Sequence, residues 1–173
     1  LKVPAVIHTV HGAPFHPYQS WPARTFFIAC ERYAATQCHK LVSVADAMSE
    51  LLVAAKVAPR EKFETVYSGM EVEPFLQSGA LRDQARAELG VNPDDVVIGK
   101  IARLFHLKGH EYVIQAATEI VAACPQAKFL FVGDGILREK FERQIAEAGL
   151  RDHFLLVGLV PPREIPKYIS VMD

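Results

Sequence analysis

The chain has 173 residues, of which half are hydrophobic and just under a quarter are charged. This composition is typical of a globular protein and excludes a disordered or fibrous chain. A net charge of −1 and the lack of a strongly basic stretch argue against a nucleic-acid partner. No apolar run reaches the roughly 18 residues that a membrane-spanning helix needs.

The first part of the chain alternates short apolar runs with helical patterns. We predict strands at residues 5–10, 40–45 and 63–67, a helix at 22–37 and a second helix that begins with Asp46 as its N-cap. Residues 71–79 contain Pro74, a glycine and several acidic side chains without any hydrophobic period. This segment is predicted to be a crossover linker.

The second part repeats the same alternation. We predict strands at residues 96–102, 128–132 and 154–157. Helices are predicted at residues 81–89, 109–123, 136–148 and 161–170. Strands that alternate with helices indicate an α/β protein with parallel sheets. We predict two partial Rossmann-like sheets, in residues 1–75 and 76–173. A single six-stranded sheet is the alternative.

The three cysteines, Cys30, Cys38 and Cys124, have neither a C-x-x-C nor a zinc-binding spacing. We expect each to be a small buried apolar side chain in a reducing compartment, which favours the cytoplasm. The chain begins inside a predicted strand without a methionine and ends without a turn. We therefore expect an internal piece of a longer protein that lacks both termini.

Parallel sheets bind ligands at the carboxyl ends of their strands, which directs attention to the loop at residues 103–109. This loop carries Arg103 and Lys108 and leads into the start of a helix. A guanidinium, an ammonium and the positive end of a helix dipole together suit a diphosphate. A solvated basic loop is the alternative interpretation.

Two further loops follow predicted strands. Gly133-Asp134-Gly135 permits a tight turn and close approach to the backbone, although it is not a full G-x-G-x-x-G pattern and also fits a plain turn. In the segment 158–162, the backbone of Leu159 and Val160 could bind the edge of a nucleobase, or the segment is only a proline-stiffened turn.

His11 follows the first predicted strand and precedes Gly12. It is a candidate for contact with substrate, or a structural histidine. His8 and His16 lie nearby and raise the question of a metal site. Because His8 and His11 lie three residues apart on or beside a strand, their side chains point to opposite faces, and no metal site is predicted.

Six motifs in chain order resemble those of the family 4 (group 1) glycosyltransferases, which have the GT-B fold. They are Val10–Phe15, Val42–Met48, Val66–Phe75, Gly99–Gly109, Phe131–Gly135 and His153–Tyr168. The third departs from the family pattern N-G-[IV]-D-x-x-x-F, because Ser68 replaces the usual Asn and Glu71 the usual Asp.

The resemblance implies a retaining glycosyltransferase that uses a UDP-, GDP- or ADP-sugar and a glycan, lipid or small-molecule acceptor. Arg103 and Lys108 would hold the donor diphosphate, Gly133, Leu159 and Val160 would lie at the nucleotide and its base, and His11 would be the catalytic-site residue at the sugar or acceptor. No cofactor or divalent metal is implied, because the cations stabilise the leaving diphosphate. Residues 1–75 would be the C-terminal part of the acceptor-side domain and residues 76–173 the N-terminal part of the donor domain.

The family's glycine-rich loop would precede Leu1, and its E-x7-E element would follow Asp173. Two pairs with this spacing, Glu111/Glu119 and Glu139/Glu147, lie within predicted helices and are rejected. We therefore expect the chain to be inactive alone. A GT-B-type sugar-nucleotide epimerase and a non-catalytic nucleotide-sugar-binding domain are the alternatives. A lipid acceptor would add peripheral contact with the inner membrane face.

Overall fold

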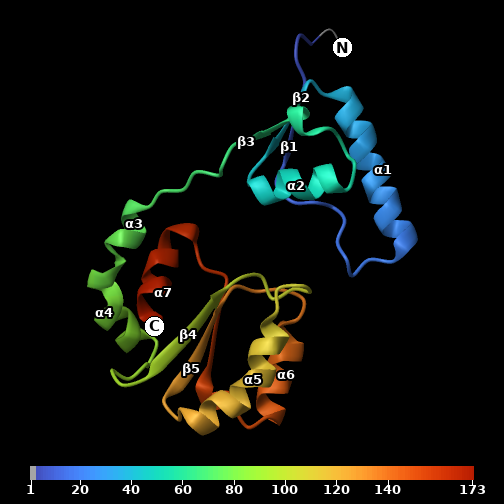
Figure 1. Cartoon of the computed structure of the whole chain (residues 1–173). Helices are drawn as coiled ribbons and strands as arrows, with labels where there is room; N and C mark the ends of the chain where they lie inside the picture. The colour runs from blue at the N-terminus through green and yellow to red at the C-terminus, as the bar shows by residue number, and fades with distance from the viewer. Residues whose placement is uncertain (1–2) are drawn as a thin grey trace. The chain divides into compact units, whose positions relative to one another are not determined.

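The computed structural model of the protein describes residues 3–173, which form two compact units (Figure 1). The first unit ends at Met70, and the second runs from Glu71 to Asp173. Each contains one three-stranded parallel sheet, with the strand orders β1-β2-β3 and β4-β5-β6. The prediction of an α/β protein with two partial parallel sheets is confirmed, and a single six-stranded sheet is excluded for the described residues.

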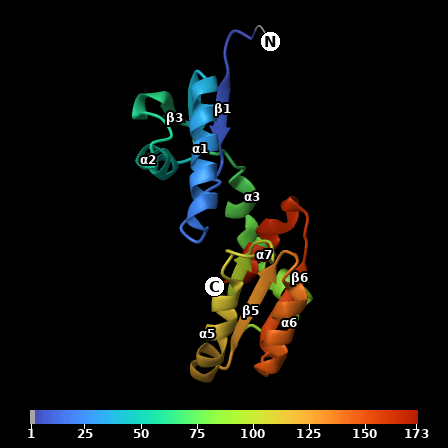
Figure 2. The same cartoon turned by 90° about the vertical axis from the view of Figure 1, so that its right-hand side faces the viewer.

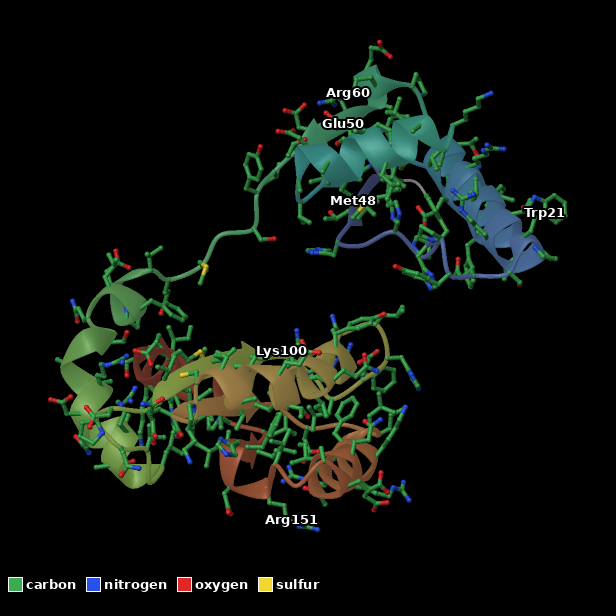
Figure 3. The ribbon with its side chains drawn as sticks, turned by 60° about the horizontal axis from the view of Figure 1, so that its bottom comes forward. Trp21, Met48, Glu50, Arg60, Lys100 and Arg151 are labelled. Carbon is green, nitrogen blue, oxygen red and sulfur yellow. The ribbon has the colours of Figure 1, made fainter. Side chains whose placement is uncertain are left out.

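The first unit places β2 at the centre of its sheet. Its elements in chain order are β1 (Ile7–Val10), α1 (Trp21–Gln37), β2 (Lys40–Ser43), α2 (Asp46–Ala54), a 3-10 turn (Arg60–Lys62) and β3 (Phe63–Thr65). Leu41 on β2 is fully buried and belongs to a core that also contains Val10, Leu52 and Phe63. In Figure 3, Trp21 points away from this unit at the start of α1, in keeping with its 78% exposed side chain.

The second unit contains most of the regular structure. Its helices and strands are α3 (Glu73–Leu76), α4 (Arg82–Glu88), β4 (Val96–Ile101), α5 (His110–Ala123), β5 (Ala127–Val132), α6 (Arg138–Glu147), β6 (Phe154–Gly158) and α7 (Ile165–Val171). Short 3-10 turns occupy Ser78–Leu81, Arg151–His153 and Pro162–Glu164.

The second unit has three layers, with α5 and α6 on one face of the sheet and α4 and α7 on the other (Figures 1 and 2). The central strand β5 is buried on both faces. Phe129 and Phe131 belong to the core beneath α5 and α6, while Leu130 and Val132 belong to the core beneath α4 and α7. This alternation follows from the two-residue period of a strand, and it explains why β5 is apolar almost throughout.

Three local predictions are wrong in whole or in part. Asp46 is the first residue of α2 rather than its N-cap, because Ala45 takes the extended conformation at that place. The segment 71–79 does connect the two sheets as predicted, but it is not without regular structure: it contains α3, with a proline in the first turn, where its fixed φ suits a helix. Of the cysteines only Cys38 is buried; Cys30 lies on an exposed part of α1, and Cys124 is half-buried at the end of α5.

Candidate functional site

Backbone hydrogen bonds join the three predicted loops at one edge of the second sheet. The amide of Ala102 donates to the carbonyl of Val132 at 3.0 Å and so continues the β4–β5 ladder. Beyond it, the amide of Leu104 donates to the carbonyl of Asp134 at 2.9 Å. On the other side, the amide of Gly133 donates to the carbonyl of Gly158 at 2.8 Å. The segments that carry Arg103, Gly133 and Leu159 are therefore held side by side.

The glycines of the turn after β5 are needed for this close approach. A Cβ atom on Gly135 would lie 2.3 Å from the carbonyl oxygen of Leu104, and one on Gly133 would meet the backbone of Ala102 in the same way. Because the amide of Gly133 already bonds to Gly158, it is not available to a nucleobase. The predicted nucleotide contact of Gly133 therefore depends on its other atoms.

The loop after β4 holds one side chain in the core and presents others to solvent. Leu104 is fully buried in the cluster that contains Phe131 and Phe141. Its neighbour Arg103 is exposed, and its guanidinium carbon lies 5.6 Å from the centre of the Phe105 ring. Because Leu104 is anchored in the core, the backbone of Arg103 has a fixed position, from which the guanidinium can reach a ligand.

Lys108 lies at the other end of the same loop, next to the start of α5, and its side chain is exposed. The chain enters the helix through two left-handed residues, Leu107 with φ 64° and Gly109 with φ 73°. Gly109 is the N-cap, and no side chain caps the first turn of α5. Within residues 3–173, neither Arg103 nor Lys108 forms a salt bridge. The loop thus presents two uncompensated cations beside a helix N-terminus, an arrangement that favours an anion.

The segment after β6 begins with Gly158, which has a φ of +80°. Leu159 is largely exposed, whereas Val160 is half-buried and packs against the core beneath α4 and α7. The structure thus places both predicted base-contact residues next to the turn of Gly133. Their contact with a base stays a prediction.

His11 belongs to the first unit and directly follows β1. Its side chain is exposed, in contrast to the buried Val10 before it. His8 lies on β1 itself, with its Nε2 atom 3.5 Å from the carboxylate of Glu31 on α1. In the described part of the chain, no group of three or more histidine, cysteine, aspartate or glutamate side chains could hold a metal ion.

Arg138 was missed by the sequence analysis. It lies in the first turn of α6, where its guanidinium donates to Glu142 at 2.8 Å and to the carbonyl of Leu156 at 3.2 Å. It also lies 3.6 Å from the carboxylate of Asp134. The four-residue spacing from Asp134 was the available signal, since residues four apart can meet when the chain turns into a helix. Arg138 links the turn after β5 to β6.

His110 was also missed as a feature of the site. It is the first residue of α5, yet its side chain is fully buried. Burial lowers its pKa, the nearby charge of Lys100 lowers it further, and Glu111 acts in the opposite direction. The ring is therefore neutral under conditions in which an exposed histidine would be partly charged.

Comparison with known families decides the relationship of this chain to other proteins. Residues 82–173 match the family described as glycosyl transferases group 1, and residues 1–74 match the family described as glycosyltransferase family 4. The chain belongs to the group 1 glycosyl transferases. Among the described residues 3–173, no helix is both long and apolar enough to cross a membrane.

Curated relatives of this glycosyl transferase chain include two bacterial enzymes. It is 29% identical over 146 residues to the 2-deoxystreptamine glucosyltransferase of Streptomyces kanamyceticus, covering 84% of this chain and 38% of that protein. It is 26% identical to the Escherichia coli UDP-Gal:alpha-D-GlcNAc-diphosphoundecaprenol alpha-1,3-galactosyltransferase, covering 99% of this chain and 44% of that protein. The chain thus spans less than half the length of these relatives.

Solved structures show the same fold. Anabaena HepE in complex with UDP and glucose superposes with a TM-score of 0.81 at 20% identity, over 98% of this chain and 45% of HepE. WaaG, a glycosyltransferase involved in lipopolysaccharide biosynthesis, superposes with a TM-score of 0.75 at 14% identity, over 99% of this chain and 52% of WaaG. The predicted GT-B fold class is confirmed.

Proposed function

We propose that the protein carrying this chain is a retaining glycosyltransferase that transfers a sugar from a nucleotide-diphosphate-sugar to a glycan, lipid or small-molecule acceptor. One observation carries the proposal. Arg103 and Lys108 are exposed at the two ends of a loop that leads into α5, and no carboxylate among residues 3–173 pairs with either. The backbone bonds from Leu104 to Asp134 and from Gly133 to Gly158 hold that loop against its neighbours.

The diphosphate of the donor is the anion that this loop suits best. Arg103 offers two parallel N–H groups to phosphate oxygens, and Lys108 adds a mobile point charge. The amides of the first turn of α5 add donors that the helix itself leaves unpaired. Two cations and a helix N-terminus can stabilise charge on a leaving diphosphate without a divalent metal, so the proposed transfer is metal-independent.

The domain roles and the remaining site residues are part of the proposal. Residues 76–173 form part of the donor domain, where Leu159, Val160 and the turn at Gly133 contact the nucleotide. Residues 1–75 form part of the acceptor-side domain, where His11 is the catalytic-site residue at the sugar or acceptor. The exposed position of His11 at the carboxyl end of β1 supports this role.

The names of the similar proteins support the classes of donor and acceptor. HepE was solved with UDP and glucose, and the galactosyltransferase is named for UDP-Gal, so a UDP-sugar is the first donor to test, ahead of GDP- and ADP-sugars. The acceptors in the names of these relatives are a small molecule, 2-deoxystreptamine, and a diphosphoundecaprenol-linked sugar. We propose a cytoplasmic protein that reaches the inner membrane face peripherally if its acceptor is lipid-linked.

Binding of a nucleoside and its diphosphate to the full-length protein tests the donor site. Loss of one charge-assisted contact costs about 1.5–3 kcal/mol. Arg103→Ala or Lys108→Ala should therefore weaken UDP binding by roughly tenfold to a hundredfold, while uridine binding changes little. Arg103→Lys should also lose affinity, because an ammonium cannot make a bidentate contact.

Lys140→Ala is the matched control, since Lys140 is exposed on α6 and forms no salt bridge within residues 3–173. Equal loss of uridine and UDP binding, or unchanged UDP binding in the Arg103 and Lys108 variants, would refute the donor-site assignment. Product analysis with a sugar donor and candidate acceptors separates a transferase from an epimerase and from a domain that only binds. A transferred sugar with the anomeric configuration of the donor is expected.

A further inference from the structure

The His110 side chain is fully buried against the rings of Phe131 and Phe141, and we call this site the aromatic box. The His110 ring centre is 4.9 Å from that of Phe131, at an angle of 79°, and 5.6 Å from that of Phe141. The residue has no exposed surface, and neither ring nitrogen has a hydrogen-bond partner among the described residues. A buried polar group without a partner lowers stability, so a phenylalanine or leucine would be the more stabilising choice here.

The box lies directly beneath the proposed diphosphate loop. His110 follows Lys108 and Gly109 in the chain, so its ring fixes the C-terminal end of the loop. Leu104, next to Arg103, is fully buried in the same core cluster as Phe131 and thereby fixes the N-terminal end. The packing of one small cluster therefore holds both ends of the loop.

Burial and one neighbouring charge disfavour a positive charge on this ring. Phe131 on β5 and Phe141 on α6 pack against it, and β4 carries Lys100, whose charge opposes protonation. The ring also lies at the positive end of the α5 dipole. Glu111, the next residue of α5, favours the charged form.

We propose that His110 is a positioning residue that makes donor binding acid-sensitive: the neutral ring holds loop 103–109 in its binding conformation, and protonation releases it. This inference rests on the proposed function, because it assigns the loop to the donor diphosphate. A protonated imidazole would leave the box, the first turn of α5 would open, and the binding-competent fraction would fall. The apparent dissociation constant rises as that fraction falls.

The direction of the pH effect follows from the lowered pKa of His110. The unfolded or opened chain binds a proton near the ordinary pKa of 6.5, whereas the buried ring does so only at lower pH. The free energy that keeps the loop closed is therefore independent of this ring's protonation above about pH 6.5 and falls as the pH drops below that value.

The test compares UDP binding by the full-length protein and by His110→Phe at pH 7.5, 6.5 and 5.5. Phenylalanine fits an aromatic box but cannot be protonated. The phosphate itself gains a proton with a pKa near 6, which affects all variants alike. The wild type should lose at least about threefold more affinity than His110→Phe between pH 7.5 and 5.5. His39→Gln, a substitution in the other unit, should behave as the wild type, and equal pH dependence of the wild type and His110→Phe would overturn the inference.

Two measurements keep the inference separate from folding and from the proposed function. If His110→Phe does not fold, NMR titration of the wild-type ring decides: a ring that stays neutral until the loop opens is expected, and free titration near pH 6.5 overturns the inference. Thermal unfolding without nucleotide should be more acid-sensitive in the wild type than in His110→Phe. Normal UDP binding by the Arg103 and Lys108 variants would refute the donor site and leave this stability result standing.

Discussion

Gly133 approaches Ala102 so closely that a Cβ atom at residue 133 would lie 2.2 Å from the Ala102 carbonyl oxygen. Gly133 also has a backbone φ of +136°, which residues with side chains rarely adopt. Gly133→Ala should therefore strain the edge where the loops after β4 and β5 meet. We expect it to lower the free energy of unfolding by about 2–4 kcal/mol, measured by urea denaturation of the full-length protein.

Gly79→Ala is the control for this substitution, because no described atom beyond its own local backbone and chain neighbours lies within 4 Å of the place that a Cβ atom would take at Gly79. It should change the free energy of unfolding by no more than about 0.5 kcal/mol. Equal effects of the two substitutions would show that contact with Ala102 does not determine the residue at position 133.

Arg86 joins α4 to the segments before β4 and after α7. It is buried, donates to the carbonyls of Asn92, Asp95 and Val171, and pairs with Asp173. Arg86→Met keeps the length of the side chain and leaves these acceptors without a partner. It should lower the free energy of unfolding by about 3 kcal/mol and speed hydrogen exchange in β4. Arg163→Met, at an exposed arginine, should leave both quantities near the wild-type values.

Asp173 pairs with Arg86 and Arg82, and we call these contacts the Asp173 clamp. The carboxylate gives this clamp a defined pH dependence. A hydrogen bond from the amide of Val97 and the charge of Arg82 hold the pKa of Asp173 below its ordinary value of 3.8. Its stabilising contribution is therefore complete above about pH 4 and is lost as the pH falls through the lowered pKa. Asp173→Asn should be less stable than the wild type at pH 7, and the difference should shrink toward pH 3. Acid unfolding curves of both proteins measure this; a constant difference would rule the clamp out as the cause.

The sheets could be predicted because their strands are defined by short-range patterns. The apolar run at β5 and the turn residues around it gave its position to within one residue. The ends of β2 and β3 were less accurate: apolar residues at 44–45 and 66–67 extend both predicted strands, but the ladder ends where Ser43 pairs with Val10 and Thr65. Hydrophobicity alone does not show where a neighbouring strand stops.

The meeting of the three loops could also be predicted, since parallel strands end at the same edge of a sheet. The role of His110 could not, and for Arg138 the four-residue spacing signals only the contact with Asp134 and not the long-range bond to Leu156. The position of His110 in the sequence, at the start of a predicted helix and beside a basic loop, is typical of an exposed residue. Only the packing of α5 and α6 over Phe131 buries its ring. Long-range packing of this kind leaves no short-range signal.

Arg138 should hold the two segments proposed to contact the nucleotide. Its guanidinium bridges Asp134 and the carbonyl of Leu156, which lies two residues before Gly158. Arg138→Lys retains the charge but cannot make both contacts at once. We expect uridine affinity to fall about threefold to tenfold, with UDP affinity falling by the same factor because the phosphate loop is unchanged. Arg143→Lys on the exposed face of α6 is the control, and unchanged uridine binding by Arg138→Lys would contradict the bridging role.

Tyr67 lies just after β3, near the end of the first unit, and is hydrogen-bonded to the start of α2. Its hydroxyl donates to the carboxylate of Asp46 at 2.5 Å, across 21 residues of sequence. This bond is the main cause that lowers the pKa of Asp46, and it raises the pKa of Tyr67. Tyr67→Phe removes only the hydroxyl, so the pKa of Asp46 should rise toward its ordinary value of 3.8, as carboxyl NMR titration would show.

The same substitution should loosen the segment at 66–70, because the ring would no longer be held at the start of α2. Faster hydrogen exchange is expected there at pH 7, with little change in the core of α2. Acidification below the pKa of Asp46 should remove the difference, since the wild-type carboxylate is then neutral and binds the hydroxyl less strongly. Tyr33→Phe is the matched control, because Tyr33 is exposed on α1. Equal exchange at 66–70 in the wild type and Tyr67→Phe at pH 7 would mean that the hydrogen bond does not restrain the chain where it leaves the first sheet.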